Sequence, residues 1–212
     1  REMLKKQIAV YYGMVSLMDK YIGKILDKLE ELGLAENTLI VFTTDHGHYY
    51  GQHGLIAKGP FMFDDLIKVP FVARLDGVIP AGTKSDALLS TVDFMQTILD
   101  FCDIPSPDGV AGVSQKQALL HPGESVRNWV ICEHNHERGK VNVRTFIKGK
   151  YKISVYLNQS RGELFDLEAD PQEHYNRFSD PRYEHVKSRL LYEFIEAEME
   201  KEPLFMPRIT NA

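Results

Sequence analysis

A long helical pattern that leads directly into a short apolar run is the strongest constraint on the fold of this chain. Apolar side chains recur every three or four positions through residues 4–32, and Gly33 follows as a helix stop. After a short turn, residues 39–42 read Leu-Ile-Val-Phe without a polar interruption. Such a run is typical of a strand covered on both faces, as in a parallel sheet with helices on each side. The opening of the chain therefore predicts an α/β unit.

Further patterns extend this unit and then change in character. Residues 69–75 indicate a second strand and residues 91–102 a second helix, and a turn-rich stretch follows Pro105. Beyond it, short β-prone runs separated by turns precede a helical pattern at residues 183–200. The β-prone runs cover residues 129–133, 141–147, 151–157 and 163–167.

The expected architecture is therefore an α/β fold in two parts. Residues 1–125 would be part of a mostly parallel sheet flanked by helices. Residues 126–212 would be a small α+β subdomain with an antiparallel sheet and one packed helix. A length of 212 residues suits a main core with a smaller appended unit.

The composition of the chain limits the classes of molecule that it can bind. The formal net charge of −5 argues against nucleic acid or an anionic membrane as a general partner, although a local cationic pocket can still bind an anion. Apolar runs all stay well short of the roughly 20 residues of a membrane-spanning helix. The first residues enter a helix without a cap or a leader sequence, so we expect the chain to be a piece of a longer protein.

The loop after the first apolar run carries a carboxylate and an imidazole side by side. Asp45 and His46 lie where open α/β sheets bind their ligands, and Gly47 permits a sharp turn there. A carboxylate oxygen suits a hard divalent cation, and imidazole adds a neutral nitrogen ligand. The alternative is a strand-end cap whose histidine only satisfies local hydrogen bonds.

The same loop carries further polar candidates. Lys58 follows the small apolar stretch at residues 55–57 and can clamp an anion; the alternative is a solvated surface lysine. His48 and His53 lie among glycines and either contact a ligand or cap a turn.

The patterns together resemble the second half of the sulfatase family, within the alkaline-phosphatase-like superfamily. The resemblance spans nearly all of the chain. Its first motifs are Y-Y-x-x-V-x-x-x-D at residues 11–19, L-x-x-L-G-L-x-x-N-T-x-x-x-F-T-x-D-H-G at 29–47, G-x-H-G-L-x-x-K-G at 51–59 and V-P-F at 69–71. Later ones are S-T-V-D at residues 90–93, G-V-S at 112–114 and G-E-L-F-D-L at 162–167. Gln96 replaces the family's usual proline, a change that touches no chemistry.

This resemblance implies roles for the loop residues. Asp45 and His46 become two ligands of a catalytic divalent cation, usually calcium (Ca2+), and Lys58 becomes the residue that contacts the sulfate ester. The family's nucleophile is a formylglycine made from a C/S-x-P-x-R motif. Cys102 (C-D-I-P-S) and Cys132 (C-E-H-N-H) both lack that motif, and their apolar neighbours predict buried free thiols instead.

We therefore expect the carboxy-terminal half of a sulfatase, inactive by itself, with the formylglycine in the missing amino-terminal half. The implied partners are that half and a sulfated small molecule or carbohydrate, and the family is usually periplasmic or secreted. Candidate contacts to the substrate are His53, His134, His136 and Arg144. For His134 and His136 the alternative is a strand end with solvated polar groups.

Other functions remain open at this point. A phosphodiesterase or phosphonate hydrolase of the same superfamily could use a cation and a lysine on a phosphoryl group equally well. A non-catalytic metal-binding module would need no nucleophile. The motif around the nucleophile, which this chain does not contain, would separate these functions.

Overall fold

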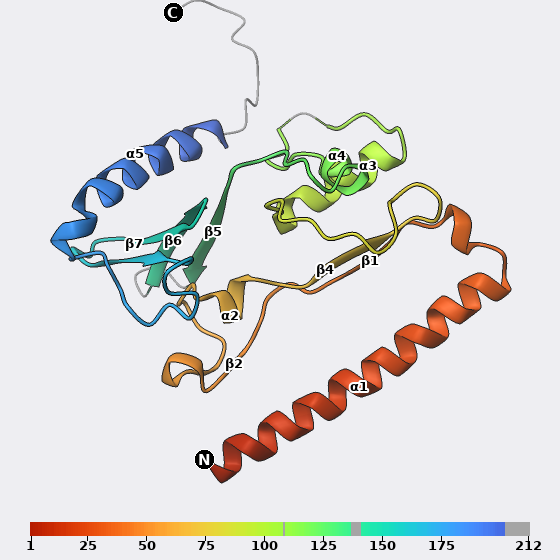
Figure 1. Ribbon diagram of the computed structural model, residues 1–212, viewed down its shortest axis with the longest axis horizontal. Coiled ribbons are helices and arrows are strands. Elements are labelled where there is room, and N and C mark those ends of the chain that lie inside the picture. Colours follow the sequence, from red (N-terminus) through yellow and green to blue (C-terminus); the bar gives the residue numbers. More distant parts are fainter. Residues whose placement is uncertain (108, 137–140, 202–212) are drawn as a thin grey trace, which may run out of the picture. The chain divides into compact units, whose positions relative to one another are not determined.

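A computed structural model describes residues 1–107, 109–136 and 141–201 of the chain (Figure 1). The chain divides into two compact units, residues 1–83 and residues 84–212. The sequence analysis expected a domain boundary near residue 125. The division into compact units does not test that boundary, and it stays a prediction.

The first unit contains the long helix and the strand that the sequence predicts. Its elements are α1 (Glu2–Glu31), the 3-10 turn η1 (Ala35–Asn37), β1 (Ile40–Thr43), β2 (Tyr49–Tyr50), the 3-10 turn η2 (Gln52–Gly54), β3 (Ile56–Ala57), α2 (Asp64–Ile67) and β4 (Phe71–Arg74). Gly33 ends α1 as predicted, with a left-handed φ of 68°. The amide of Leu34 donates to the Leu29 carbonyl and that of Gly33 to the Glu30 carbonyl, which satisfies carbonyls left open at the helix end.

The direction of the first strand pair differs from the expectation. β1 and β4 pair antiparallel, with Phe42 opposite Val72, whereas the apolar run of β1 had suggested a parallel neighbour. Both side chains are exposed, at 42% and 60%. An uninterrupted apolar run reports that both faces of a strand are suited to burial, and it carries no information on the direction of the neighbouring strand. The α/β class itself is confirmed.

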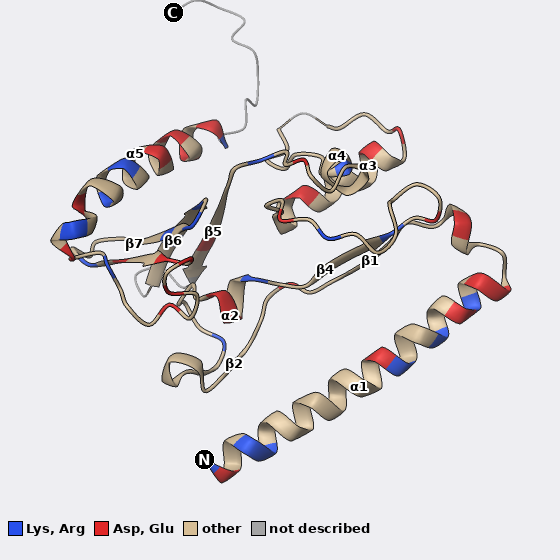
Figure 2. Ribbon diagram, viewed as in Figure 1, with Lys and Arg blue, Asp and Glu red and all other residues tan. Residues whose placement is uncertain are grey.

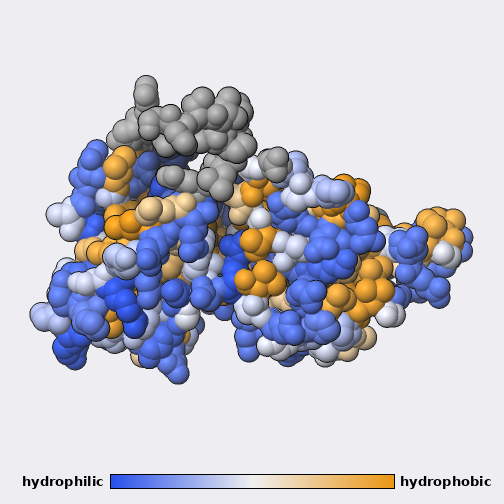
Figure 3. Space-filling model, turned by 90° about the horizontal axis from the view of Figure 1, so that it is seen from above, coloured by the Kyte–Doolittle hydropathy of each residue, from blue (hydrophilic) through white to orange (hydrophobic). Residues whose placement is uncertain are grey.

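α1 exposes apolar residues along much of its length. It has no buried residue, and its uncharged central stretch at residues 7–18 forms the tan middle of the helix in Figure 2. The exposed large apolar side chains of this stretch are Val10, Tyr11, Tyr12, Met14, Val15, Leu17 and Met18. Apolar residues also reach the surface on the face seen in Figure 3, where they are orange. Within the described residues, the helix therefore lacks the covering layer that its amphipathic pattern predicts.

Within the described residues, each helix is too short or too polar to cross a bilayer.

The second unit has the small antiparallel sheet and the packed helix that were predicted. Its elements are η3 (Thr91–Asp93), α3 (Phe94–Phe101), α4 (Lys116–Leu120), β5 (Trp129–His136), β6 (Val141–Lys148), β7 (Tyr151–Tyr156), β8 (Gly162–Asp166), η4 (Pro181–Tyr183) and α5 (Glu184–Glu200). The sheet order is β5-β6-β7-β8, and neighbours run antiparallel. Its core residues, on one face of the sheet and on α5, are Phe146, Ile153, Leu164, Leu190, Phe194 and Ala197.

The two cysteines are not joined by a disulfide, and they are less buried than predicted. Cys102 is exposed and Cys132 is half-buried. Cys102 is the C-cap residue of α3, where helical spacing no longer decides which side of the chain a side chain occupies.

One buried carboxylate organises the start of the second unit. Asp93 is 2% exposed and accepts hydrogen bonds from the amides of Ser90 (3.0 Å) and Val113 (3.0 Å). It also accepts from the side-chain amide of Gln115 (2.8 Å) and from the guanidinium of Arg127. A buried carboxylate is tolerated because these donors replace the water it has lost.

We predict that Asp93→Asn destabilises the second unit by about 3–5 kcal/mol, since Arg127 then keeps a nearly buried charge without its anion. Trp129 is the single tryptophan of the chain, and the Arg127 guanidinium lies over its ring, so urea unfolding followed by tryptophan fluorescence reports on this region. Glu168→Ala, which removes a carboxylate from an exposed ion pair with Lys150, is the control and should cost less than about 1 kcal/mol. Equal effects of the two substitutions would contradict the role given to Asp93.

Candidate functional site

The loop between β1 and β4 is fixed by a close approach of two backbones. The amide of Gly47 donates to the Leu66 carbonyl of α2 at 2.7 Å. A Cβ atom on Gly47 would overlap the Asp65 carbonyl oxygen and lie 2.9 Å from its carbon. Gly47 is therefore required by proximity to α2. The sharp turn expected from the sequence is not the reason, because Gly47 is not among the residues with positive φ.

Asp45 is an exposed carboxylate held by its neighbours. Its Oδ1 atom accepts hydrogen bonds from the His46 amide (2.9 Å) and the Thr44 hydroxyl (3.1 Å), and its side chain is 83% exposed. The His46 amide, the Thr44 hydroxyl and the neighbouring imidazole lower the pKa of the Asp45 carboxyl below its usual value. The carboxylate therefore stays ionised at neutral pH and directs its second oxygen toward His46.

The His46 ring is oriented by its own backbone. Nδ1 lies 2.7 Å from the Gly47 carbonyl oxygen, which can only accept, so Nδ1 carries a proton and donates it. In the neutral ring Nε2 is then an acceptor. This nitrogen lies 3.6 Å from Asp45 Oδ2 and 3.3 Å from the Lys58 ammonium. The three residues expected to act on a cation and a sulfate thus converge on one point.

A small hairpin places Lys58 next to His46 Nε2. β2 and β3 pair antiparallel with Tyr49 opposite Ala57, and the fully buried Tyr49 donates its hydroxyl to the Phe61 carbonyl at 2.8 Å. Ala57, directly before Lys58, has a left-handed φ of 66°. An alanine in this conformation carries a strain of roughly 1–2 kcal/mol, and such strain gathers at functional sites. Spacing patterns in the sequence contain no signal for this strained residue.

His53 lies in a protein environment rather than at an open surface. Its ring stacks on Phe63 with 3.7 Å between centroids, and Nε2 lies 3.9 Å from Asp65 Oδ2. The side chain is 13% exposed. These contacts favour a role in holding the loop against the start of α2, while contact with a substrate stays a prediction.

The remaining candidates lie on the sheet of the second unit. Glu133 is opposite Arg144 and His134 is opposite Val143, and successive side chains alternate between faces, so His134 and Arg144 occupy opposite faces. Arg144 forms ion pairs with Glu133 (3.0 Å) and Glu198 of α5 (2.8 Å). The side chain of His136 lies outside the described residues. The structure therefore does not bring His134 and Arg144 into one site, and their contact with a substrate stays a prediction.

The donors around His46 fit a hard divalent cation in kind. Asp45 Oδ2 is an ionised oxygen, and His46 Nε2 is a neutral nitrogen oriented by its Nδ1–H bond, the arrangement found for histidine ligands. Across the described residues, groups of three or more His, Cys, Asp or Glu side chains placed to hold a metal ion are absent.

Comparison with known proteins shows the family of this chain. Residues 2–104 match the family model described as Sulfatase. The chain is also 31% identical to an N-acetylglucosamine-6-O-sulfatase of Bacteroides thetaiotaomicron, over 85% of this chain and 34% of that protein.

This chain belongs to the sulfatase family.

Solved structures agree with the family at the level of the fold. One is BT4656 in complex with its substrate D-glucosamine-2-N,6-O-disulfate, with a TM-score of 0.82 and 27% identity over 88% of this chain and 39% of that one. The phosphonate monoester hydrolase of Agrobacterium radiobacter has a TM-score of 0.83 and 25% identity over 92% of this chain and 42% of that one. This sulfatase chain spans less than two fifths of the length of the first curated relatives it matches.

We predict that Gly47→Ala loosens the site loop, because the added methyl group must push the loop away from α2. Amide hydrogen exchange of residues 43–68 should become faster by roughly fivefold or more, as expected for a cost above about 1 kcal/mol. Gly59→Ala is the matched control, since a Cβ atom there would meet nothing within 4 Å. Unchanged exchange in Gly47→Ala would show that the loop does not depend on this contact.

Proposed function

We propose that this chain forms part of the active site of an enzyme that hydrolyses sulfate esters. Asp45 and His46 would be two ligands of a divalent cation, calcium in the family, and Lys58 would contact the sulfate group. The observation that carries this proposal is the convergence of Asp45 Oδ2 and the Lys58 ammonium on His46 Nε2, within 3.6 Å.

The contact between Lys58 and His46 supports a division of roles. When bound, the cation would neutralise negative charge on the sulfate oxygens as the ester S–O bond breaks. His46 would use the same Nε2 lone pair for the cation that Lys58 contacts in this structure. The lysine ammonium would then be released to donate to a sulfate oxygen, where its interaction strengthens as charge develops.

The remaining parts of the active site would come from outside this chain. The nucleophile proposed for the complete enzyme is the family's formylglycine, since both cysteines of this chain lack the C/S-x-P-x-R motif. Calcium usually takes six or more oxygen ligands, and Asp45 with His46 supply too few. We therefore propose that the missing amino-terminal half of the protein provides the other ligands and the nucleophile.

The apolar surface of the first unit supports this partner. The central stretch of α1 and the exposed pair Phe42 and Val72 leave a surface that is costly to expose to water. The short coverage of the longer relatives is consistent with a missing partner segment. We propose that the amino-terminal half packs on this surface.

A sulfated carbohydrate is the proposed class of substrate. One relative is an N-acetylglucosamine-6-O-sulfatase, and one structural neighbour was solved with D-glucosamine-2-N,6-O-disulfate as its substrate. These names suit a sulfated carbohydrate as the substrate of the complete protein.

A phosphonate monoester hydrolase is the second candidate. The structure from Agrobacterium radiobacter matches the fold as well as the sulfatases do, and a lysine and a cation serve a phosphoryl group equally well. Turnover of aryl phosphonate esters in preference to sugar sulfates by the complete protein would favour this function.

We predict that Lys58→Ala lowers kcat/KM of the complete protein for a sugar sulfate by about 10²–10³, the usual effect of removing one preorganised donor. Lys58→Arg should restore activity only in part, because the forked guanidinium does not occupy the position of an ammonium. The matched control is Lys68→Ala, a lysine that is 80% exposed in the same unit, with an expected change below about twofold. Steady-state rates decide the matter, and a value near wild type for Lys58→Ala would remove this residue from the site.

We also predict that the 212-residue chain alone hydrolyses no aryl sulfate, even with excess calcium, and binds calcium weakly. Absorbance assays and titration calorimetry measure the two properties. Turnover that is lost in Lys58→Ala, or tight calcium binding that is lost in Asp45→Ala, would mean that the chain carries a complete site.

A further inference from the structure

His53 attaches the tip of the β2–β3 hairpin to the start of α2. It lies in the turn η2, and its backbone is in the left-handed region with a φ of 52°. A residue other than glycine keeps this conformation where its surroundings hold it there. The His53 ring stacks on the Phe63 ring at 5° between planes, and Nε2 lies 3.9 Å from Asp65 Oδ2. These two contacts hold the tip of the hairpin.

The stack of His53 on Phe63 closes a short loop around Lys58. The loop consists of residues 53–63, and Lys58 is its midpoint. A chain segment whose ends are held together can occupy far fewer conformations than an open segment of the same length. Ala57, with its left-handed φ of 66°, directly precedes the lysine inside this loop. The position of the Lys58 backbone therefore depends on a contact between residues five positions away on either side.

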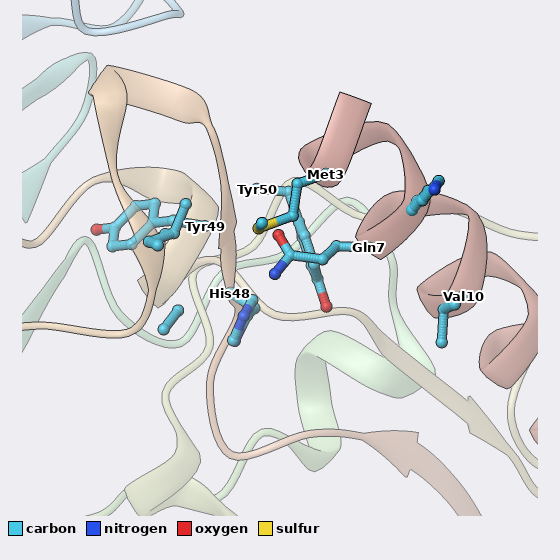
Figure 4. Close-up of a pocket in the computed structure, with 9 residues that line it drawn as sticks. Met3, Gln7, Val10, His48, Tyr49 and Tyr50 are labelled. Carbon is cyan, nitrogen blue, oxygen red and sulfur yellow. The ribbon is translucent and has the colours of Figure 1, made fainter. Parts of the chain in front are cut away.

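The end of the hairpin from which Lys58 departs is attached to the same segment. Tyr49 and Tyr50 point to opposite sides of the hairpin, Tyr50 toward α1 and Tyr49 away from it (Figure 4). The buried Tyr49 donates its hydroxyl to the Phe61 carbonyl at 2.8 Å, and its ring meets the edge of Phe63 at 6.4 Å between centroids. The hairpin is therefore attached to residues 61–63 at both of its ends.

The two proposed cation ligands are held by a different contact. The amide of Gly47 donates to the Leu66 carbonyl at 2.7 Å, and the Gly47 carbonyl oxygen orients the His46 ring. This attachment lies before the hairpin along the chain and is separate from the His53 stack. Loss of the stack should therefore displace Lys58 and leave the cation ligands in place.

We propose that His53 is a positioning residue for Lys58, and that its stack on Phe63 closes the loop that holds the lysine ammonium where it meets the sulfate group. This inference rests on the proposed function, which gives Lys58 its contact with the sulfate. A misplacement of about 1 Å can lower a rate by a factor of about 10², so even a small opening of the loop has a measurable effect. The role differs from a contact with the substrate, because the His53 side chain is 13% exposed and one face of its ring is covered by Phe63.

Two substitutions of His53 separate its ring from its polar nitrogens. His53→Asn keeps a polar group and tolerates the left-handed backbone, but it removes the stacking ring. It should lower kcat/KM of the complete protein for a sugar sulfate by about tenfold to a hundredfold. His53→Phe keeps a ring that can stack on Phe63 and should restore most of this activity. A contact between His53 nitrogens and the substrate would give the opposite order of the two variants.

A double-mutant cycle shows whether His53 acts through Lys58. In the Lys58→Ala background, His53→Asn should lower kcat/KM by less than about twofold, because the lysine that the loop positions is absent. The matched control is His185→Ala, at an exposed histidine in the first turn of α5, which should leave kcat/KM unchanged in both backgrounds.

Amide hydrogen exchange in the complete protein gives a readout that does not depend on catalysis. His53→Asn should speed exchange at residues 54–57 by roughly fivefold or more, because the hairpin opens more often without its stack. Exchange at residues 43–47 should stay unchanged, since the Gly47 amide keeps its bond to Leu66. Equal acceleration of both segments would mean that His53 supports the whole loop and does not position the lysine.

An equal loss of activity from His53→Asn in the wild-type and Lys58→Ala backgrounds, or unchanged exchange at residues 54–57, overturns the positioning role. Lys58→Ala by itself tests the proposed function. A value near wild type for Lys58→Ala rejects that function, whereas a low value combined with full activity of His53→Asn rejects only the inference about His53.

Discussion

The contact between Gly47 and the backbone of α2 is the constraint on which the candidate site depends. It holds the chain after β1 so closely to α2 that a Cβ atom cannot fit, and the amide of Gly47 is used in a 2.7 Å hydrogen bond to Leu66. The Gly47 carbonyl oxygen is at the same time the acceptor that orients the His46 ring. One glycine thus determines both the path of the loop and the ring nitrogen that faces Asp45 and Lys58.

The two units differ in how far their apolar and charged side chains are buried and paired. In the second unit, α5 covers one face of the sheet, and the stacked rings of Phe146 and Phe194, 5.2 Å apart, lie in a closed core. Its buried charges have partners, as Asp93 has in Arg127 and Lys152 in Glu173. In the first unit, by contrast, α1 has no buried residue although its central stretch at residues 7–18 is uncharged and mostly apolar. The stability of the first unit, and with it the geometry of the site, should therefore depend on what covers α1.

The site combines a rigid support with exposed reactive groups. Tyr49 is buried and its hydroxyl is bonded to Phe61, while Asp45 is 83% exposed only a few residues away. This difference suits a site where the protein positions charges for a ligand that arrives from solvent, because preorganised groups need not rearrange during the reaction. The strain at Ala57 is consistent with such a site, where local geometry is maintained at the expense of stability.

The sequence by itself predicted the long helices, the main strands and the family, because apolar spacing and contiguous motifs are local properties. It did not predict the short elements β2, β3, α2 and α4, which are too short to show a period. The sequence also made Asp45, His46 and Lys58 candidates for the site, and these residues lie within one short segment. Only the tertiary structure decided the antiparallel pairing of β1 with β4, the real need for glycine at position 47 and the separation of His134 from Arg144 on opposite faces. Each of these features depends on which segments of backbone lie next to each other. Periodic patterns in the sequence do not report contacts between residues that are distant along the chain.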